Sequence, residues 1–276
     1  MSEPASESMG TGVFANAADE RQRGGGVREP ILTLRSVVAG YGAGDILKGV
    51  DLDVDAGTVT CLIGPNGAGK STVLKCVSGL LRPRQGTVTF RGDRIDRLSP
   101  RQRLARGVVH VPQDRSLFPA MTVWDNLLMG GYAMSDQKRV RQRVAEVAEI
   151  FPICRKRAAD HAGSLSGGEQ KQVELARTLV LDPGLVLLDE PSIGLDPKSR
   201  TQVFASIRGL ADQGITVLLV EQNARSGLAA ADVGAVMEGG MVRLTDSGTA
   251  LLASPDVARL YLGGHAVLTR TTKERT

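Results

Sequence analysis

A run of residues in the first third of the chain has the types and spacing needed to hold a phosphate. Residues 64–71 read Gly-Pro-Asn-Gly-Ala-Gly-Lys-Ser and match the G-x-x-x-x-G-K-[ST] pattern in every fixed position. Glycines let the backbone close around a phosphate without Cβ clashes. Lys70 supplies a positive charge for the β- and γ-phosphates, and the Ser71 hydroxyl is a suitable Mg²⁺ ligand. The nucleotide-binding residues predicted from this run are Gly64, Pro65, Asn66, Gly67, Ala68, Gly69, Lys70, Ser71 and Thr72.

The segments on either side of this run support the prediction. Residues 59–63 are apolar and mostly β-branched, which predicts a strand, and residues 72–80 predict a helix. A strand that feeds a glycine-rich turn into a helix aims several backbone N–H groups at one point, and the helix dipole adds partial positive charge. The alternative is a chance glycine-rich turn, which would not require this strand and helix.

Polar residues at the ends of two further predicted strands are candidates for the chemistry. Residues 185–188 form an apolar run that ends in Asp189 and Glu190, which predicts a buried parallel strand with acids at its carboxyl end. Ligands of open α/β sheets bind at that end of the strands. Gln113 follows a second short strand, residues 108–111. Residues 165–170, Leu-Ser-Gly-Gly-Glu-Gln (the LSGGEQ segment), open a helix whose first N–H groups can meet an anion.

Composition limits the possible functions. The chain has 276 residues, of which 42% are hydrophobic, so we expect one large domain or a domain with an inserted subdomain. Aromatic residues make up only 3%, and the formal net charge is +4. Platforms for stacking single-stranded nucleic acid are therefore nearly absent, and the mild basic charge is better explained by a solvated surface. We expect no nucleic-acid partner.

Cysteine usage and hydropathy predict the compartment. Cys61, Cys76 and Cys154 are odd in number and widely spaced, which favours buried free thiols in a reducing compartment over disulfides or a metal site. No apolar run approaches the roughly 18 to 20 residues that span a bilayer, and the N-terminus lacks the apolar core of a signal peptide. We therefore expect a soluble cytoplasmic chain that reaches a membrane only through a partner.

The pattern along the chain predicts an α/β fold with two additions. Residues 1–29 lack periodic apolar positions and predict a disordered tail, residues 30–265 form the domain, and residues 266–276 predict a frayed C-terminal tail. Apolar residues at 50, 52 and 54 alternate with aspartates, which predicts a strand with one wet face in a small antiparallel sheet. A helical insert is expected over about 114–163.

One helix of this insert and one aromatic residue carry further expectations. Residues 137–151 predict a helix with an apolar stripe at Val140, Val144, Val147 and Phe151, and the arginines at 139, 141 and 143 are expected off that stripe. Tyr41 is either a half-buried strand aromatic or a platform for an adenine ring.

Taken together, five motifs in one order resemble a known family. GPNGAGKS, a glutamine after a strand, LSGGEQ, LVLLDE and SIGLDP are similar to the ATPase subunit of an ATP-binding cassette (ABC) transporter, over roughly residues 31–263. The resemblance implies a phosphate-loop NTPase fold: a RecA-like, mostly parallel sheet flanked by helices, an antiparallel β subdomain and the helical insert. It also implies an ATP-hydrolysing enzyme that uses Mg²⁺. Two such subunits would close head-to-tail around two ATP molecules, bound to transmembrane permeases at the cytoplasmic face of the membrane.

The resemblance assigns roles position by position. Lys70 and the loop amides would hold phosphates, Glu190 would be the general base, and Tyr41 would stack on adenine. Asp196 would lie at the interface between subunits. The Mg²⁺ ligands, direct or through water, would be Ser71, Gln113 and Asp189. The residues that contact a nucleotide held mainly by the other subunit would be Leu165, Ser166, Gly167, Gly168 and Glu169.

One departure from the family pattern narrows the resemblance. The family usually has a switch histidine where this chain has Gln222, and the histidines here stand at 110, 161 and 265. A glutamine amide can donate a hydrogen bond to the γ-phosphate, but it cannot carry positive charge or relay a proton. The site therefore either hydrolyses slowly and serves mainly to bind, or works with Glu190 and Mg²⁺ alone.

The residues around Gln222, together with two further segments, resemble one subfamily of this family. Glu-Gln-Asn-Ala at 221–224, together with residues 114–126 and 261–264, is similar to the second ATPase subunit of branched-chain amino acid importers and their urea and short-chain amide relatives. Those systems also contain a solute-binding protein. Asp196 stands where many members have alanine.

The resemblance leaves open which kind of ABC ATPase this chain is and what one group of apolar residues contacts. The alternatives are the ATPase of a lipid or glycan exporter, and an ABC ATPase that never meets a membrane. Phe118, Met121 and Trp124 are expected either to contact a permease or to belong to the core of the insert.

Overall fold

A computed structural model describes residues 30–114 and 116–261, with the side chains of the last two residues excepted. The predicted tails, 1–29 and 266–276, lie outside the described residues, as do residues 262–265. Among the described helices, none combines the length and hydrophobicity needed to cross a bilayer.

The larger of two sheets is mostly parallel, and its strand order is β10-β9-β3-β8-β7-β6. Only the β9–β10 pair is antiparallel within it. All residues of β3, β7 and β8 are buried, which explains why their sequences are continuous apolar runs rather than alternating ones. The six strands are β3 (Val59–Ile63), β6 (Val108–Val111), β7 (Leu185–Asp189), β8 (Thr216–Val220), β9 (Val233–Glu238) and β10 (Met241–Ser247).

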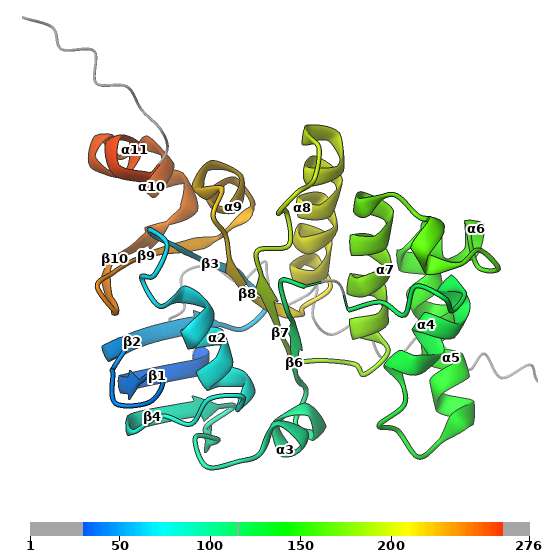
Figure 1. The fold of residues 1–276 in the computed structure, drawn as a ribbon, viewed down its shortest axis with the longest axis horizontal. Helices are drawn as coiled ribbons and strands as arrows, with labels where there is room; N and C mark the ends of the chain where they lie inside the picture. Colours follow the sequence, from blue (N-terminus) through cyan, green and yellow to red (C-terminus); the bar gives the residue numbers. More distant parts are fainter. Residues whose placement is uncertain (1–29, 115, 262–276) are drawn as a thin grey trace, which may run out of the picture.

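The smaller sheet is antiparallel and has the order β2-β1-β4-β5. In β2 the apolar residues at 50, 52 and 54 are buried while Asp51 and Asp53 are exposed, so the predicted one-sided strand is confirmed. Figure 1 shows this sheet below and to the left of the larger one. The predicted α/β class with an added antiparallel sheet is therefore confirmed. The strands are β1 (Pro30–Ala39), β2 (Leu47–Asp55), β4 (Gln85–Phe90) and β5 (Asp93–Arg94).

Two hydrophobic cores share the larger sheet. Successive residues of β3 point to opposite cores: Leu62 packs with the antiparallel sheet and α2, whereas Cys61 and Ile63 pack with the helices on the other face. The phosphate-loop helix thus lies between two sheets. The helices outside the right-hand part of Figure 1 are α2 (Lys70–Ser78), α3 (Pro100–Ala105), α8 (Pro197–Asp212), α9 (Ala224–Ala230), α10 (Gly248–Ala253) and α11 (Pro255–Tyr261).

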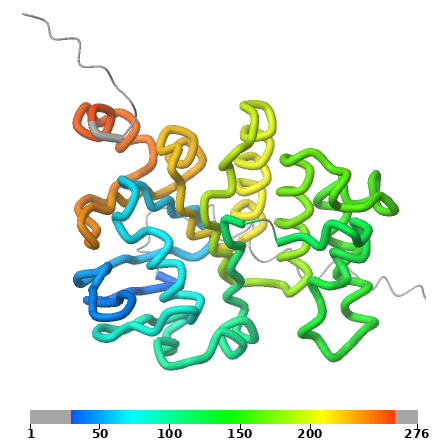
Figure 2. Tube along the Cα trace, viewed as in Figure 1, coloured from blue at the N-terminus to red at the C-terminus, as the bar shows by residue number. Residues whose placement is uncertain are grey.

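A group of helices projects from the edge strand β6, on the right of Figures 1 and 2. These helices are α4 (Val123–Gly130), α5 (Gln137–Ile150), α6 (Pro152–Lys156) and α7 (Gly167–Leu179). The predicted limits of the helical insert, 114–163, stay a prediction; α4, α5 and α6 lie inside them, and α7 packs against α4, α5 and α6.

The apolar stripe of α5 is confirmed, but one arginine prediction is wrong. Val140, Val144, Val147 and Phe151 are buried, and Arg139 and Arg141 are exposed. Arg143 was expected off the stripe and is instead 7% exposed. It lies three residues after Val140 and four before Val147, so helical geometry places it on the packed face. Its charge is satisfied there by Asp182 Oδ1 at 3.1 Å, the Leu179 carbonyl at 3.0 Å and Glu146 at 2.6 Å.

The three cysteines are buried and free, as the sequence predicts.

Candidate nucleotide-binding and active site

The phosphate loop joins β3 to α2, and the structure shows why its two fixed glycines, Gly64 and Gly69, cannot carry a Cβ. Gly64 has φ +150, and a Cβ there would lie 2.2 Å from the Met237 carbonyl oxygen of β9. Gly69 has φ +102, and a Cβ there would lie 2.7 Å from Leu47 Cδ2. Gly69 caps α2 without a side-chain hydrogen bond, so no side chain takes the first N–H groups of this helix. The loop therefore presents backbone donors at the start of a helix dipole.

Lys70 lies over its own loop. Its side chain is 5% exposed, and Nζ donates to the carbonyl oxygens of Gly64 at 2.8 Å and Pro65 at 3.0 Å. Burial lowers the pKa of the Lys70 ammonium, while Glu190 and Asp189 act in the opposite direction. The loop thus holds one cation close to the two acids at the end of β7.

Ser71 and Asp189 form the pair that the Mg²⁺ prediction requires. Ser71 Oγ donates to Asp189 Oδ1 at 2.9 Å, which joins the start of α2 to the end of β7. A hydroxyl and a carboxylate are hard oxygen ligands, and Mg²⁺ in nucleotide sites uses one or two such groups beside phosphates and water. Within the described residues, no cluster of three or more His, Cys, Asp or Glu could hold a metal alone. The donor set therefore fits Mg²⁺ only together with a phosphate.

Glu190 has an unusual backbone and an unusual electrostatic environment. Its φ is +47, which is uncommon for a residue with a Cβ, and its N–H donates to the Val220 carbonyl at 2.9 Å. Gln113 Nε2 donates to Glu190 Oε2 at 3.3 Å, so the predicted Mg²⁺ ligand Gln113 contacts the predicted base rather than Ser71 or Asp189. Burial raises the pKa of the Glu190 carboxyl, the charge of Asp189 raises it further, and Lys70 lowers it.

A pocket of about 300 Å³ opens over these groups. It contains the loop, the start of α2 and the predicted base, and Ile46 is a lining residue that the sequence did not point to. Leu165 to Glu169 do not line it, and Figure 1 shows β6, β7 and β8 between α2 and α7. The lining residues are Ile46, Asn66, Gly67, Gly69, Lys70, Ser71, Thr72 and Glu190.

Tyr41 lies in the turn after β1 and not in a strand, so the strand-aromatic alternative is wrong. The side chain is 50% exposed, and Lys75 Nζ lies 5.6 Å from the centre of its ring. An exposed ring of this kind leaves a face open for stacking, and its contact with adenine stays a prediction.

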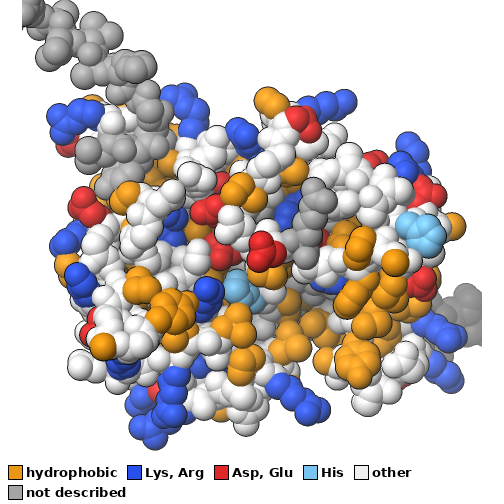
Figure 3. Space-filling view, viewed as in Figure 1, with side chains coloured by type: hydrophobic (Ala, Val, Ile, Leu, Met, Phe, Trp, Pro, Cys, Tyr) orange, Lys and Arg blue, Asp and Glu red, His pale blue; other side chains and the backbone are white. Residues whose placement is uncertain are grey.

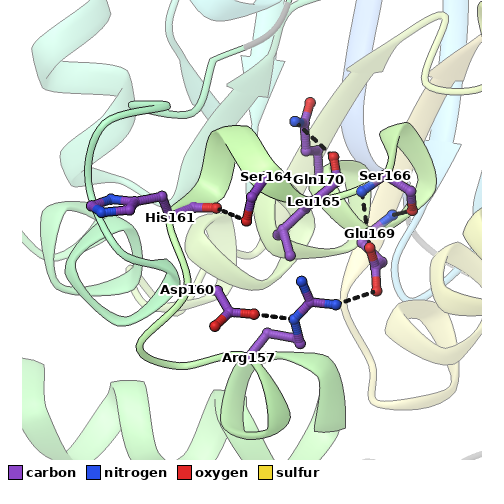
Figure 4. Close-up of polar contacts among 8 residues, drawn as sticks. All are labelled: Arg157, Asp160, His161, Ser164, Leu165, Ser166, Glu169 and Gln170. Atoms are coloured by element: carbon purple, nitrogen blue, oxygen red, sulfur yellow. Dashed lines mark hydrogen bonds and ion pairs between the residues drawn. The ribbon is translucent and has the colours of Figure 1, made fainter.

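The LSGGEQ segment is ordered by a capping box at the start of α7 (Figure 4). Glu169 Oε2 accepts from the Ser166 N–H at 2.9 Å, and Ser166 Oγ accepts from the Glu169 N–H at 3.4 Å. Arg157 approaches Glu169 Oε1 at 3.5 Å and also pairs with Asp160. The Ser166 N–H is the main cause of a lowered pKa at Glu169. Glu169 therefore orders the helix start in addition to its predicted contact.

The two glycines of this segment allow α7 to approach α8 closely. A Cβ at Gly168 would lie 2.6 Å from both Cβ and Oγ of Ser199, and a Cβ at Gly167 would lie 3.2 Å from Leu195. Asp196 caps α8 and accepts from the Lys198 and Ser199 N–H groups at 3.0 and 3.1 Å. These residues thus have local structural roles beside the ones that the family resemblance implies.

The residues after β8 include a carboxylate that the sequence prediction missed. Gln222 is exposed, and its side chain makes no hydrogen bond with the described residues. Glu221 beside it is 2% exposed; its Oε1 accepts from the Ser192 N–H at 3.0 Å and its Oε2 from the Asn223 N–H at 3.3 Å. Burial raises the pKa of the Glu221 carboxyl. The signal was present in the sequence, since Glu221 directly follows a buried apolar strand just as Glu190 does.

Two residues of α7 that the sequence prediction missed hold the segment after Gln113. Glu174 Oε1 accepts from the Ser116 N–H at 2.7 Å, and Arg177 donates to the Ser116 carbonyl at 2.9 Å. The Arg177 guanidinium lies 5.8 Å from the Phe118 ring centre.

The three candidate contact residues of this region differ in exposure. Phe118 is 44% exposed, whereas Met121 is half-buried and Trp124 is half-buried and packs against the core. Figure 3 shows hydrophobic side chains gathered on this part of the visible face. Phe118 is thus the most accessible of the three.

Comparison with known proteins gives consistent matches. The family model described as ABC transporter matches residues 47–193. The chain is 38% identical to the high-affinity branched-chain amino acid transport ATP-binding protein BraG of Pseudomonas aeruginosa, over 85% of this chain and 100% of BraG. It is 35% identical to the lipopolysaccharide export system ATP-binding protein LptB of Haemophilus influenzae, over 84% of this chain and 97% of LptB.

Among solved structures, the chain is similar to the ADP conformation of MJ1267, an ATP-binding cassette of an ABC transporter. The TM-score is 0.77 at 28% identity, over 85% of this chain and 99% of MJ1267.

Proposed function

Because this chain belongs to the ATP-binding proteins of ABC transporters and is an ATPase, we propose that it energises uptake of branched-chain amino acids or similar small polar solutes through a separate permease. The observation that carries the proposal is the similarity to BraG along the whole of that protein. Gln222, in the Glu-Gln-Asn-Ala run that resembles the importer subfamily, supports the same conclusion.

In this proposal the described residues divide the work of ATP hydrolysis. Lys70 and the loop amides bind the phosphates. Ser71 and Asp189 would hold Mg²⁺, which would neutralise phosphate charge. Glu190 accepts a proton from the attacking water, and Gln113 orients the Glu190 carboxylate through their 3.3 Å hydrogen bond. Phosphoryl transfer needs this combination of a positioned water and a neutralised phosphate, with little covalent chemistry from the protein.

A second ATPase subunit completes the site in this proposal. The LSGGEQ segment does not line the pocket of its own chain, so its helix N-terminus is left to face a nucleotide held by another subunit. A head-to-tail pair, of identical or homologous chains, would place each LSGGEQ segment against the partner's phosphate loop. Asp196 then lies at the interface, where its capping bonds keep the start of α8 in place.

The permease contact is assigned to the exposed part of the segment after Gln113. Phe118 is exposed and lies beside the half-buried Arg177 of α7, which donates to the Ser116 carbonyl, so a displacement of this surface would be transmitted to α7 and to the segment after Gln113. The chain would sit on the cytoplasmic face of the membrane through this contact, and a solute-binding protein would act on it only indirectly.

A second candidate function is export of a lipid or glycan, because LptB is 35% identical to this chain over nearly its whole length. The phosphate loop, the acids of β7 and the LSGGEQ segment serve either direction of transport. The two candidates therefore differ in the permease and the transported molecule and not in the ATPase chemistry.

Uptake by cells with an altered gene tests the proposal. Disruption of the gene should lower uptake of radiolabelled leucine, and the wild-type gene should restore it whereas the Glu190→Gln variant should not. Urea and acetamide are tested in parallel as the alternative solutes. Unchanged uptake of every solute, together with altered surface lipid or glycan, would contradict import and favour export.

A further inference from the structure

We infer that Glu221 is a positioning residue for ATP hydrolysis, whose buried carboxylate ties the turn after Glu190 to the turn that carries Gln222. The inference rests on the proposed roles of Glu190 and Gln222, since Glu221 itself acts through them.

The contacts of Glu221 join these two turns directly. Its Oε1 accepts from the N–H of Ser192, two residues after Glu190, at 3.0 Å. Its Oε2 accepts from the N–H of Asn223, the residue after Gln222, at 3.3 Å. The strands that precede Glu190 and Glu221, β7 and β8, are neighbours, with Asp189 paired to Val220. One carboxylate therefore bridges the ends of two parallel strands at the site.

Packing holds the Glu221 side chain in place. A Cβ at Gly227 of α9 would lie 3.0 Å from Glu221 Cβ and 2.7 Å from Cys61 Sγ, so α9 lies directly against the stem of Glu221. The Glu221 N–H donates to the Leu62 carbonyl at 3.2 Å. Asn223 in turn caps α9 by accepting from the Ser226 N–H at 3.0 Å. Gln222 is thus fixed between a strand end and a capped helix.

The hydrogen bonds at residue 221 require a carboxylate and not just any polar side chain. Burial of a carboxylate costs free energy, and here burial raises its pKa. Hydrogen bonds accepted by both oxygens of the carboxylate offset that free-energy cost. A glutamine side chain has a single carbonyl oxygen and cannot accept at both positions. Two backbone donors face this position, so the acid suits both of them.

The identity of residue 222 explains why such a tie matters in this chain. A histidine can be drawn to a phosphate by its charge, but the amide of Gln222 is neutral. Its position must therefore come from the backbone, and the backbone on both sides of Gln222 is held by Glu221 and Asn223. Loss of the bridge should let the Gln222 turn and the Glu190 turn move independently.

Steady-state kinetics of Glu221→Gln test the inference, in the subunit composition in which the wild type is active. We expect kcat for MgATP to fall at least tenfold while KM changes less than threefold. The double variant Glu221→Gln/Gln222→Ala should lose no more than the larger of the two single losses, because both act through one turn. If Glu221→Gln does not fold, Glu221→Asp replaces it: its side chain is one carbon too short to reach both the Ser192 and Asn223 N–H groups, so the same fall in kcat is expected.

Asp232→Asn is the control away from the site. Asp232 also accepts a backbone N–H, that of Val59 at 2.8 Å, at the opposite end of β3, although it is exposed and pairs with Arg208 at 2.7 Å. It should lower thermal stability with little change in kcat per folded molecule. A Glu221→Gln variant that behaves like this control, or single losses that multiply in the double variant, would overturn the inference. Failure of the proposed role of Glu190 gives a different result, because Glu190→Gln would then keep its turnover. Failure of the import proposal would leave all of these kinetic effects in place and change only the transported solute.

Discussion

At the residue scale, Glu190 has both the surroundings of a general base and a strained backbone conformation. It follows a fully buried strand, adopts φ +47, and lies beside a second carboxylate and a buried ammonium. Strained backbone of this kind persists only where the surroundings hold it, and it often lies at active sites. The Val220 carbonyl and Gln113 provide two of those holding contacts.

The raised pKa of Glu190 predicts the pH dependence of turnover. A base works as the carboxylate, so protonation removes activity, and a raised pKa moves this loss to a higher pH. The acidic limb of kcat/KM for MgATP should therefore lie above about pH 4.3, the ordinary value for glutamate. ATP affinity measured over the same pH range separates protonation of the nucleotide from that of the enzyme. A limb at or below the ordinary glutamate value would contradict the effect of burial.

Gln222→His tests whether the amide is only a weak substitute for the family histidine. An imidazole can carry charge and relay a proton near neutral pH, which an amide cannot. We expect turnover per site to be equal to the wild type or higher, and Gln222→Ala, which removes the donor, to be lower than both. Turnover is measured with saturating MgATP. A severe loss in Gln222→His alone would mean that the amide has a specific role.

Sequence patterns predicted the residues that belong to recognisable motifs and missed those whose role depends on contacts outside the motifs. Ser71 and Asp189 belong to two motifs of the resembled family, and the structure joins them by a 2.9 Å hydrogen bond. Glu221 reaches the Ser192 N–H across 29 residues, and nothing in its own neighbourhood signals that partner. Arg143 was misplaced because charge suggested solvent, whereas Asp182 and the end of α7 satisfy it inside the packing.

At the element scale, the contact of α7 with α8 decides whether the LSGGEQ segment keeps its shape. Gly168→Ala would bring a Cβ to 2.6 Å from Ser199, and relief requires a shift of one helix. We expect the free energy of unfolding to fall by about 1–3 kcal/mol, the usual cost of overpacking. Urea unfolding followed by circular dichroism measures it.

Gly209→Ala is the control for that prediction. Gly209 also lies in a helix, α8, but a Cβ there meets no atom within 4 Å. Alanine should therefore be neutral or raise stability by up to about 1 kcal/mol through helix propensity. Equal destabilisation by the two substitutions would mean that the close approach at Gly168 is not the cause.

Helices and strands with a clear pattern of apolar residues or a clear end signal were predictable from the sequence. Short elements that form because of tertiary packing were not. The bounds of β3 and β6 agree with their predicted apolar runs. The helix α9 was not predicted, because its residues alternate small and polar types without a clear stripe. The Asn223 cap and the packing of Gly227 on Cys61 form it instead.

At the scale of the whole molecule, the fold places the phosphate loop and the LSGGEQ segment in different parts of the structure. The antiparallel sheet and α2 share one core with the phosphate loop, while α7 and its LSGGEQ segment belong to the other core. This separation was predictable only through the family resemblance, because no local pattern states which parts of a chain stay apart. It is also the reason that the proposed function needs a second subunit.

Calorimetric titration of the purified protein with ATP, with and without Mg²⁺, tests the central claim most directly. The account predicts Mg²⁺-dependent binding that Lys70→Ala weakens at least about tenfold, as loss of a charged hydrogen-bond donor should. Binding that Lys70→Ala leaves unchanged, or no Mg²⁺-dependent affinity for adenine nucleotides with or without the partner subunit, would contradict it.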